Sequence, residues 1–190
     1  MSEVDWWRGK HGDDYTGRNA DADIEARIDM WEEILKEITP DSVLEIGAGS
    51  GSNLHALHYR LGYTPISAVE PNKRAREILQ GAGFNVYDGT AANPGATADL
   101  VFTSGVLIHI PPAELLDACR GIYGAAERYV VCIEYFSADP EEKPYRGRKL
   151  WKRDFGKFWL DNFDVYPLGC GFAWKETTGL DNLTWWAFSK

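Results

Sequence analysis

The segment LEIGAGSGSN, residues 44–53, constrains the possible fold more than any other part of this sequence. A short apolar run, typical of a strand, ends in a turn that contains Gly47, Gly49 and Gly51, and the residues from Asn53 to Leu61 follow with a helical pattern. Glycines at such a turn let a ligand approach the backbone, and the start of the helix presents free N–H groups. The segment therefore predicts a strand, a ligand-binding turn and a helix in succession.

The rest of the chain alternates between strand and helix patterns. Strands are expected at residues 66–70, 84–88, 99–103 and 128–136, and helices at residues 24–38, 72–80 and 112–123, the first of them capped by Asp21 or Asp23. Two strand-like runs in the tail, 162–172 and 183–190, predict an antiparallel pair at one sheet edge. This alternation predicts an α/β fold in which helices cover both faces of a mostly parallel sheet. A length of 190 residues with 44% hydrophobic content fits a single domain over residues 1–190.

Charge and cysteine content exclude several classes of function. A net charge of -9 argues against nucleic acid as a partner. The three cysteines show no paired spacing, so neither a disulfide framework nor a metal site is expected. The N-terminus has no signal-peptide core, and no apolar run reaches membrane-spanning length. We therefore expect a cytoplasmic protein without a membrane partner, and the sequence leaves its oligomeric state open.

An acidic residue follows the glycine turn at the position where a ribose is often bound. Glu70 ends the expected strand 66–70, and a carboxylate there can accept both ribose hydroxyls. The dinucleotide pattern requires a third glycine at position 52, but Ser52 stands there, and the third glycine comes one position earlier. A turn that only packs a strand on a helix is the simpler alternative for the glycines.

Four motifs in order carry a resemblance to a known family. They are the E-x-G-x-G-x-G pattern from Glu45 to Gly51, AVEPN at 68–72, VYDGT at 86–90 and DLVFTSGVLIHIPP at 99–112. Together they resemble the motifs of class I S-adenosylmethionine-dependent methyltransferases. The resemblance implies a Rossmann-like, seven-stranded, mostly parallel sheet whose last strand is antiparallel, and S-adenosyl-L-methionine as the cofactor.

The resemblance also implies which residues contact the cofactor. The glycines would pass under its methionine part, Glu70 would hold the ribose, and Asp88 would accept a hydrogen bond from the adenine amino group. Ser104 and Gly105 would lie next to the sulfonium. The full expected set is Tyr15, Arg18, Glu45, Gly47, Ala48, Gly49, Gly51, Asn53, Leu54, Glu70, Pro71, Asn72, Asp88, Gly89, Thr90, Ser104, Gly105 and Val106.

The opening segment, residues 1–20, shows no clear helical or strand period but is rich in glycine, aromatic and charged residues. It stands where methyltransferases of this class often carry a lid. Arg18 is expected to pair with the methionine carboxylate, Tyr15 to approach the sulfonium, and Trp6 and Trp7 to exclude water. An N-terminal arm that packs only for stability is the alternative.

The opening also narrows the resemblance. With SGVLIHIPP, EYF, PYRG and LWKRDFGKFW, it is similar to a group called pseudaminic acid biosynthesis-associated methylases. That similarity implies a small-molecule acceptor in a biosynthetic pathway, without specifying the molecule.

A basic stretch interrupts this acidic chain at residues 137–160, which are expected to form an insertion on the substrate side after the fifth strand. Clustered cations with aromatic neighbours favour a polar, anionic acceptor such as an amino acid, an acidic sugar or a nucleotide-sugar. A solvated amphipathic helix is the alternative, in which Trp151, Phe155, Phe158 and Trp159 belong to the core. The candidate substrate-binding residues are Trp7, Glu134, Tyr145, Arg146, Arg148 and Trp151.

The expected chemistry is methyl transfer to a nitrogen or oxygen atom. His109, which follows the fourth motif, is a candidate base, and His11 and Tyr135 are further catalytic candidates. For His109, a structural role in the loop before Pro111 is an equal alternative. Two other functions stay open at this point: a catalytically silent protein that binds the cofactor, and a nicotinamide-dependent oxidoreductase with an unusual turn.

Overall fold

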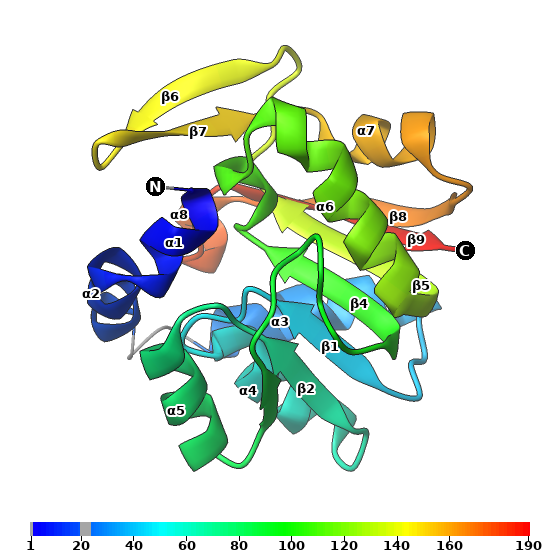
Figure 1. The fold of residues 1–190 in the computed structure, drawn as a ribbon. Coiled ribbons are helices and arrows are strands. Elements are labelled where there is room, and N and C mark those ends of the chain that lie inside the picture. Colours follow the sequence, from blue (N-terminus) through cyan, green and yellow to red (C-terminus); the bar gives the residue numbers. More distant parts are fainter. Residues whose placement is uncertain (1, 20–23) are drawn as a thin grey trace.

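A computed structural model describes residues 2–19 and 24–190, and its centre is a seven-stranded sheet (Figure 1). The strands are β1 (Val43–Ile46), β2 (Ile66–Val69), β3 (Asn85–Tyr87), β4 (Ala98–Ser104), β5 (Ala126–Glu134), β8 (Tyr166–Ala173) and β9 (Leu183–Ser189). Their order is β3-β2-β1-β4-β5-β9-β8, and β9 runs antiparallel to both of its neighbours. The predicted mostly parallel sheet with an antiparallel last strand is confirmed, as is the antiparallel pair at its edge.

Helices cover both faces of the sheet, as predicted. One face carries α3 (Glu25–Ile34), which continues into the short turn η1 (Leu35–Glu37), together with α4 (Ser52–Leu61) and α5 (Lys73–Gly81). The other carries α6 (Pro112–Ala125) and α7 (Phe155–Asn162), and the short α8 (Lys175–Thr178) precedes β9. Trp31 packs edge-on against Phe102 in the first layer, and Trp159 packs near Phe188 in the second. The expected cap of the first of these helices, Asp21 or Asp23, lies outside the described residues.

The opening segment is helical, which corrects the expectation of an irregular segment. It forms α1 (Glu3–Arg8) and α2 (Lys10–Arg18), separated at Gly9. Ser2 caps α1 by accepting the N–H of Asp5, whose carboxylate accepts the N–H of Ser2 in return. No residue of α1 is buried, and the buried residues of α2 are Gly12 and Thr16, so the apolar period that normally indicates a helix is missing from the sequence.

The basic stretch forms a hairpin followed by a helix. Its strands are β6 (Glu141–Tyr145) and β7 (Arg148–Lys152), which form a separate two-stranded sheet. Arg146 occupies a left-handed backbone conformation in the turn, with φ 46°. Trp151 therefore lies on a strand and is half-buried, whereas Phe155 and Trp159 lie on α7 and are fully buried. In the part of the chain that the structure describes, no helix combines the length and apolar character needed to cross a membrane.

Candidate functional site

A cavity of about 350 Å³ opens where the carboxyl ends of β1, β2 and β4 meet. This is the edge of an open parallel sheet at which ligands commonly bind, and the volume is typical of a small-molecule site. The glycine turn and the end of β2 form its floor. Residues of α1 and α2 form its roof, and the loop 89–92 and α6 close one side.

The floor has a backbone that can be approached closely. Gly47 and Gly49 line the cavity and have φ angles of 76° and 54°, which non-glycine side chains rarely adopt. A Cβ atom on Gly47 would collide with the side chain of Val106 across the cavity. Gly51 does not line the cavity and serves packing, because a Cβ atom there would collide with Leu79. A role in packing alone thus describes Gly51, whereas Gly47 both packs against Val106 and lines the cavity, and Gly49 lines the cavity in ordinary contact with Tyr15.

Glu70 is the buried carboxylate of this floor. One oxygen accepts the N–H of Gly49 at 2.8 Å and the other accepts the N–H of Asn72 at 2.7 Å. Burial raises the pKa of Glu70, although these two N–H groups oppose the shift. Each carboxylate oxygen can accept a second hydrogen bond, so Glu70 remains suited to ribose hydroxyls.

Glu45, expected at the cofactor, lies under the floor instead of in the cavity. It is fully buried and accepts a hydrogen bond from the amide of Asn53, whose oxygen receives N–H groups from Arg27 and Trp31. Burial raises the pKa of Glu45 to about 8. Through Asn53, these hydrogen bonds connect α3 to the start of α4, beside the glycine turn.

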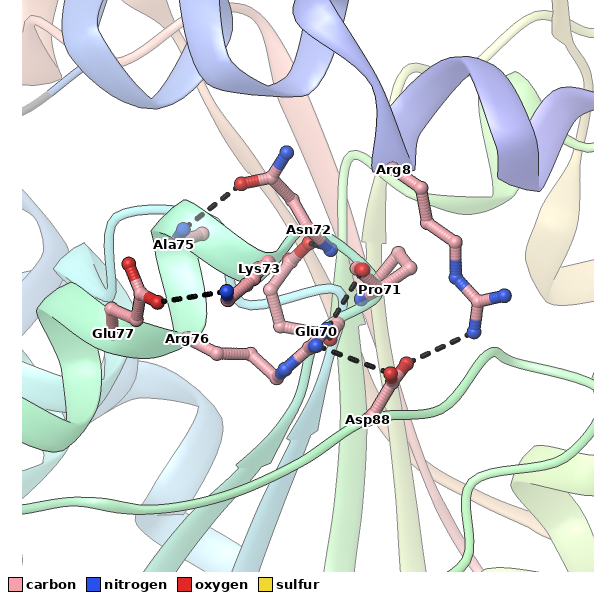
Figure 2. Close-up of polar contacts among 9 residues, drawn as sticks. All are labelled: Arg8, Glu70, Pro71, Asn72, Lys73, Ala75, Arg76, Glu77 and Asp88. Carbon is pink, nitrogen blue, oxygen red and sulfur yellow. Dashed lines mark hydrogen bonds and ion pairs between the residues drawn. The ribbon is translucent and has the colours of Figure 1, made fainter.

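Asp88 forms ion pairs with two arginine side chains. Arg8 of α1 pairs with one carboxylate oxygen at 2.9 Å, and Arg76 of α5 pairs with the other at 3.1 Å (Figure 2). Asp88 is half-exposed and does not line the cavity, whereas its neighbours Gly89 and Thr90 do. The structure therefore gives Asp88 a role in joining the roof to the floor, which the sequence analysis did not foresee.

Asn72 makes a second connection between roof and floor. Its side-chain oxygen caps α5 by accepting the N–H of Ala75 at 2.9 Å (Figure 2). Its amide nitrogen donates to the backbone oxygen of Trp7 and to a carboxylate oxygen of Asp13 in the roof. Asn72 also lines the cavity.

Glu134 was expected to bind the substrate, but it is completely buried outside the cavity lining. It accepts N–H groups from Val106 at 3.0 Å and Leu107 at 2.9 Å, and the hydroxyl of Thr103. Burial raises the pKa of Glu134 to about 7. Because Ser104, Gly105 and Val106 line the cavity, Glu134 acts as a brace for the loop that bears them.

His109 ends the turn η2 (Leu107–His109) after β4 and lines the cavity. Its ring lies 5.0 Å from that of Trp7 and 5.2 Å from that of Tyr145, measured between centroids. Burial lowers the pKa of His109 to about 4, and its Nδ1 atom has no hydrogen-bond partner in the described part of the chain. A neutral imidazole is thus available to a ligand as a hydrogen-bond partner and weak base.

The other two catalytic candidates lie outside this cavity. His11 stacks on Trp6 with ring centroids 3.4 Å apart, inside the roof, and burial is the main cause that lowers its pKa. The Tyr135 hydroxyl donates to Asp181 at 2.6 Å beside a separate surface groove, and burial raises the pKa of this phenol. Neither residue is among those that line the cavity above the glycine turn.

The basic hairpin holds the roof and does not line the cavity. Arg148 pairs with Glu3 of α1 at 2.6 Å and lies over the ring of Trp6. Tyr145 packs against Trp6 and His109, Trp151 donates to Glu142 of the same hairpin, and Arg146 is exposed beside the Tyr145 ring. Of the substrate candidates, Trp7 alone is among the described lining residues. The expected anion-binding cations are therefore not in the site.

The predicted cofactor residues divide into two groups. Those that line the cavity are Tyr15, Gly47, Gly49, Glu70, Pro71, Asn72, Gly89, Thr90, Ser104, Gly105 and Val106. Those outside the lining are Arg18, Glu45, Ala48, Gly51, Asn53, Leu54 and Asp88, of which Ala48 and Leu54 belong to a hydrophobic cluster and Arg18 is exposed on α2.

Several lining residues escaped the sequence analysis. On the roof these are Glu3, Val4, Gly12 and Thr16, and on α6 they include Glu114 and Asp117. Glu3 and Trp7, like Gly12 and Thr16, are spaced i,i+4, which places each pair on one helix face. This spacing is the sequence signal from which the lining residues could have been predicted. Glutamate, glycine and threonine, however, are not the apolar residues that normally indicate a buried helix face.

The residues of the floor fit a cofactor that contains a nucleoside. The floor offers close backbone approach at Gly47 and Gly49, a buried carboxylate at Glu70 for hydroxyl donors, and apolar contact from Val106. Within residues 2–19 and 24–190, no group of three or more His, Cys, Asp or Glu residues has an arrangement that could hold a metal ion.

Comparison with known families gives one match. A family model described as a methyltransferase domain matches residues 19–164, which is most of the chain. A search of curated protein sequences finds no significant match.

Solved structures share the fold at low sequence identity. Magnesium protoporphyrin IX methyltransferase from Synechocystis PCC 6803, solved with bound S-adenosylmethionine (SAM), is 14% identical, with TM-score 0.74 over 100% of this chain and 98% of that one. The 1,6-didemethyltoxoflavin-N1-methyltransferase of Burkholderia thailandensis, solved with its substrate and S-adenosylhomocysteine (SAH), is 14% identical, with TM-score 0.78 over 100% and 91%. The glycopeptide N-methyltransferase MtfA with SAH is 10% identical, with TM-score 0.69 over 96% and 98%.

Proposed function

Because this chain belongs to the methyltransferase domain family, we propose that it transfers the methyl group of SAM to a nitrogen or oxygen atom of a polar small molecule. The observation that carries the proposal is the cavity above Gly47, Gly49 and Glu70, which residues of α1 and α2 cover on one side. When bound, SAM supplies a methyl group on a positively charged sulfur.

The chain's own residues would then bind, orient and exclude water. Gly47 and Gly49 admit the cofactor to the backbone, and Glu70 accepts its ribose hydroxyls. Trp7 and Tyr15 cover the cavity, which keeps water from the reacting atoms. His109 presents a neutral imidazole to the acceptor, and Glu134 fixes the loop from which His109 projects. Much of the rate enhancement would come from this alignment of acceptor and methyl group.

Two finer features of the acceptor have different support. Its small size is supported by the cavity volume and by the resemblance to the pseudaminic acid-associated group, which residues 7–19, 104–112, 134–136, 144–147 and 150–159 carry. An anionic acceptor is not supported, because Arg148 forms an ion pair with Glu3 and the described lining contains no lysine or arginine. We therefore leave the anionic acceptor out of the proposal.

Calorimetry with SAH and with NAD on the purified protein tests the cofactor. We expect SAH to bind with a dissociation constant in the micromolar range and NAD to give no heat of binding. The ribose of either ligand could reach Glu70, but the cavity has no third glycine at position 52 to admit a pyrophosphate. Tight binding of NAD without SAH would contradict the proposal.

Labelled methyl transfer separates an enzyme from a silent cofactor-binding protein. The protein is incubated with methyl-labelled SAM and a small-molecule extract of its source cells, and labelled products are separated by mass. We expect a product heavier than its acceptor by one methylene group. Binding of SAH without any labelled product would favour the silent alternative.

A further inference from the structure

One part of the cavity lining belongs to neither the glycine turn nor the end of β2, and we call it the wall. It is formed by α1 and by the segment after η2, and it includes Val4, Trp7, Ile110 and Pro111. Trp7 and His109 are in ring contact across this wall. With the cofactor on the glycine floor, this apolar and aromatic wall is the part of the cavity left for an acceptor.

Glu3 is the charged group of that wall. It lies one helical turn before Trp7, so both side chains are on the same face of α1. Its side chain is only 11% exposed. One carboxylate oxygen, Oε2, accepts a hydrogen bond from Arg148 at 2.6 Å, and the other, Oε1, is buried with no hydrogen-bond partner among the described residues. A buried acceptor of this kind is rare in native proteins unless a ligand or water completes it.

The charges around Glu3 decide which ligand group completes it. The charged residues of the described lining are Glu3, Glu70, Glu114 and Asp117, all carboxylates. Asp117 pairs with Arg120 at 2.8 Å on the outside of α6, whereas Glu114 has no ion pair among the described residues. The described lining thus carries carboxylates and no lysine or arginine, which favours a cationic ligand group over an anionic one.

We propose that Glu3 receives the amino group of the acceptor, and that the acceptor is an amine with an apolar or aromatic body. This inference rests on the proposed function and names its substrate class. The ammonium form binds between Glu3 and the apolar wall and loses one proton to water before it reacts. The amine nitrogen then forms the new N–C bond with its lone pair, the electron pair of the broken C–S bond stays on sulfur, and the product nitrogen carries the positive charge.

A matched ligand series tests the proposal on the protein saturated with SAH. Benzylamine, benzyl alcohol and benzoate share one aromatic body and differ only in their head group. We expect benzylamine to bind about tenfold more tightly than the other two, from the gain of a hydrogen bond to a charged group. Ligand-observed NMR provides the affinities. Equal binding of all three, preference for benzoate, or no binding of benzylamine would overturn the proposal.

Two variants separate ligand binding by Glu3 from its contact with Arg148. Glu3→Gln removes the charge but keeps the size, and it should remove the preference for benzylamine. Arg148→Met breaks the same ion pair from the other side and leaves Glu3 in place, so the preference should persist. If Arg148→Met abolishes it as fully as Glu3→Gln does, Glu3 only ties α1 to the hairpin, and the proposal is wrong.

Calorimetry with SAH on the same samples distinguishes this proposal from the proposed function. SAH should bind the wild type and both variants. Failure of the wild type to bind SAH would refute the function itself, whereas normal SAH binding without a benzylamine preference would refute only the amine acceptor.

Discussion

The floor and the roof of the cavity are built from contacts of very different range. In the floor, Glu70 accepts N–H groups from residues 2 and 21 positions away along the chain. In the roof, Arg148 reaches Glu3 across 145 positions, and Arg8 reaches Asp88 across 80. The floor is thus specified by one supersecondary unit, whereas the roof exists only after distant segments have folded against each other.

The two regions also differ in how tightly they are packed. Beneath the floor, Leu54, Ala68 and Leu79 are fully buried. In α1 no residue is buried, and in α2 only Gly12 and Thr16 are. The free energy of the floor comes from burial of apolar surface, and that of the roof from ion pairs and aromatic contacts, which individually contribute less. Changes in the apolar packing beneath the floor should therefore cost more folding free energy than changes in the roof.

The largest effect is expected from Gly51→Ala in the floor. Gly51 has φ 84° and a Cβ atom would collide with the buried side chain of Leu79. A left-handed backbone costs about 1 to 2 kcal/mol for a non-glycine residue, and overpacking about 1 to 3. We expect the free energy of unfolding in urea to fall by roughly 3 to 4 kcal/mol.

Gly179→Ala is the matched control. Gly179 is also left-handed, with φ 73°, but no neighbouring atom lies within 4 Å of its added Cβ. Only the backbone cost of about 1 to 2 kcal/mol applies there. If both variants lose the same free energy, the packing of the turn on α5 is not what makes the floor rigid.

His109 lies between the two regions, and its titration measures how well the roof covers it. Burial lowers its pKa from 6.5 to about 4 in the folded protein. The unfolded chain therefore takes up a proton first as the pH falls, and the wild type loses stability from pH 6.5 downward until pH 4. Relative to His109→Gln, this loss should reach about 2.5 kcal/mol between pH 7.5 and pH 4.5.

Urea unfolding of both proteins at several pH values provides this difference. His58→Gln, at an exposed position on α4, controls for general effects of removing a histidine. A wild-type and His109→Gln pair with parallel pH profiles would mean that the roof leaves His109 open to water.

The same contrast explains what the sequence could predict. The sheet, the glycine turn and the position of Glu70 at the end of a strand could be predicted from the sequence. Each depends on residue type and short spacing, such as Gly47 and Gly49 directly after an apolar run. Arg148 was assigned to the substrate because its distant partner Glu3 leaves no trace in the local sequence. Glu134 was misassigned for a related reason, since a carboxylate at a strand end looks the same whether it faces a ligand or backbone N–H groups.

Glu70→Ala should weaken the binding of SAH to the folded protein. It removes a charged acceptor for the ribose hydroxyls and frees the N–H groups of Gly49 and Asn72. The expected loss is about 2 kcal/mol, or roughly thirtyfold in affinity, the range for a hydrogen bond to a charged group. Calorimetry with SAH measures it. Unchanged affinity in a folded variant would remove Glu70 from the ribose site.

The smallest effect concerns Asp88, where floor and roof meet through two arginines (Figure 2). Arg8 comes from the roof and its side chain is 47% exposed, so its ion pair contributes at most about 0.5 to 1 kcal/mol and less at high salt. Arg8→Ala should leave the urea midpoint nearly unchanged while hydrogen exchange in residues 3–18 becomes faster.

Arg76→Ala should act differently, because Arg76 also donates to the backbone oxygens of Glu70 and Pro71. It should lower the affinity for SAH through the floor, with little effect on exchange in the roof. If the two variants changed SAH affinity and hydrogen exchange in the same way, the floor and the roof would not be stabilised separately at Asp88.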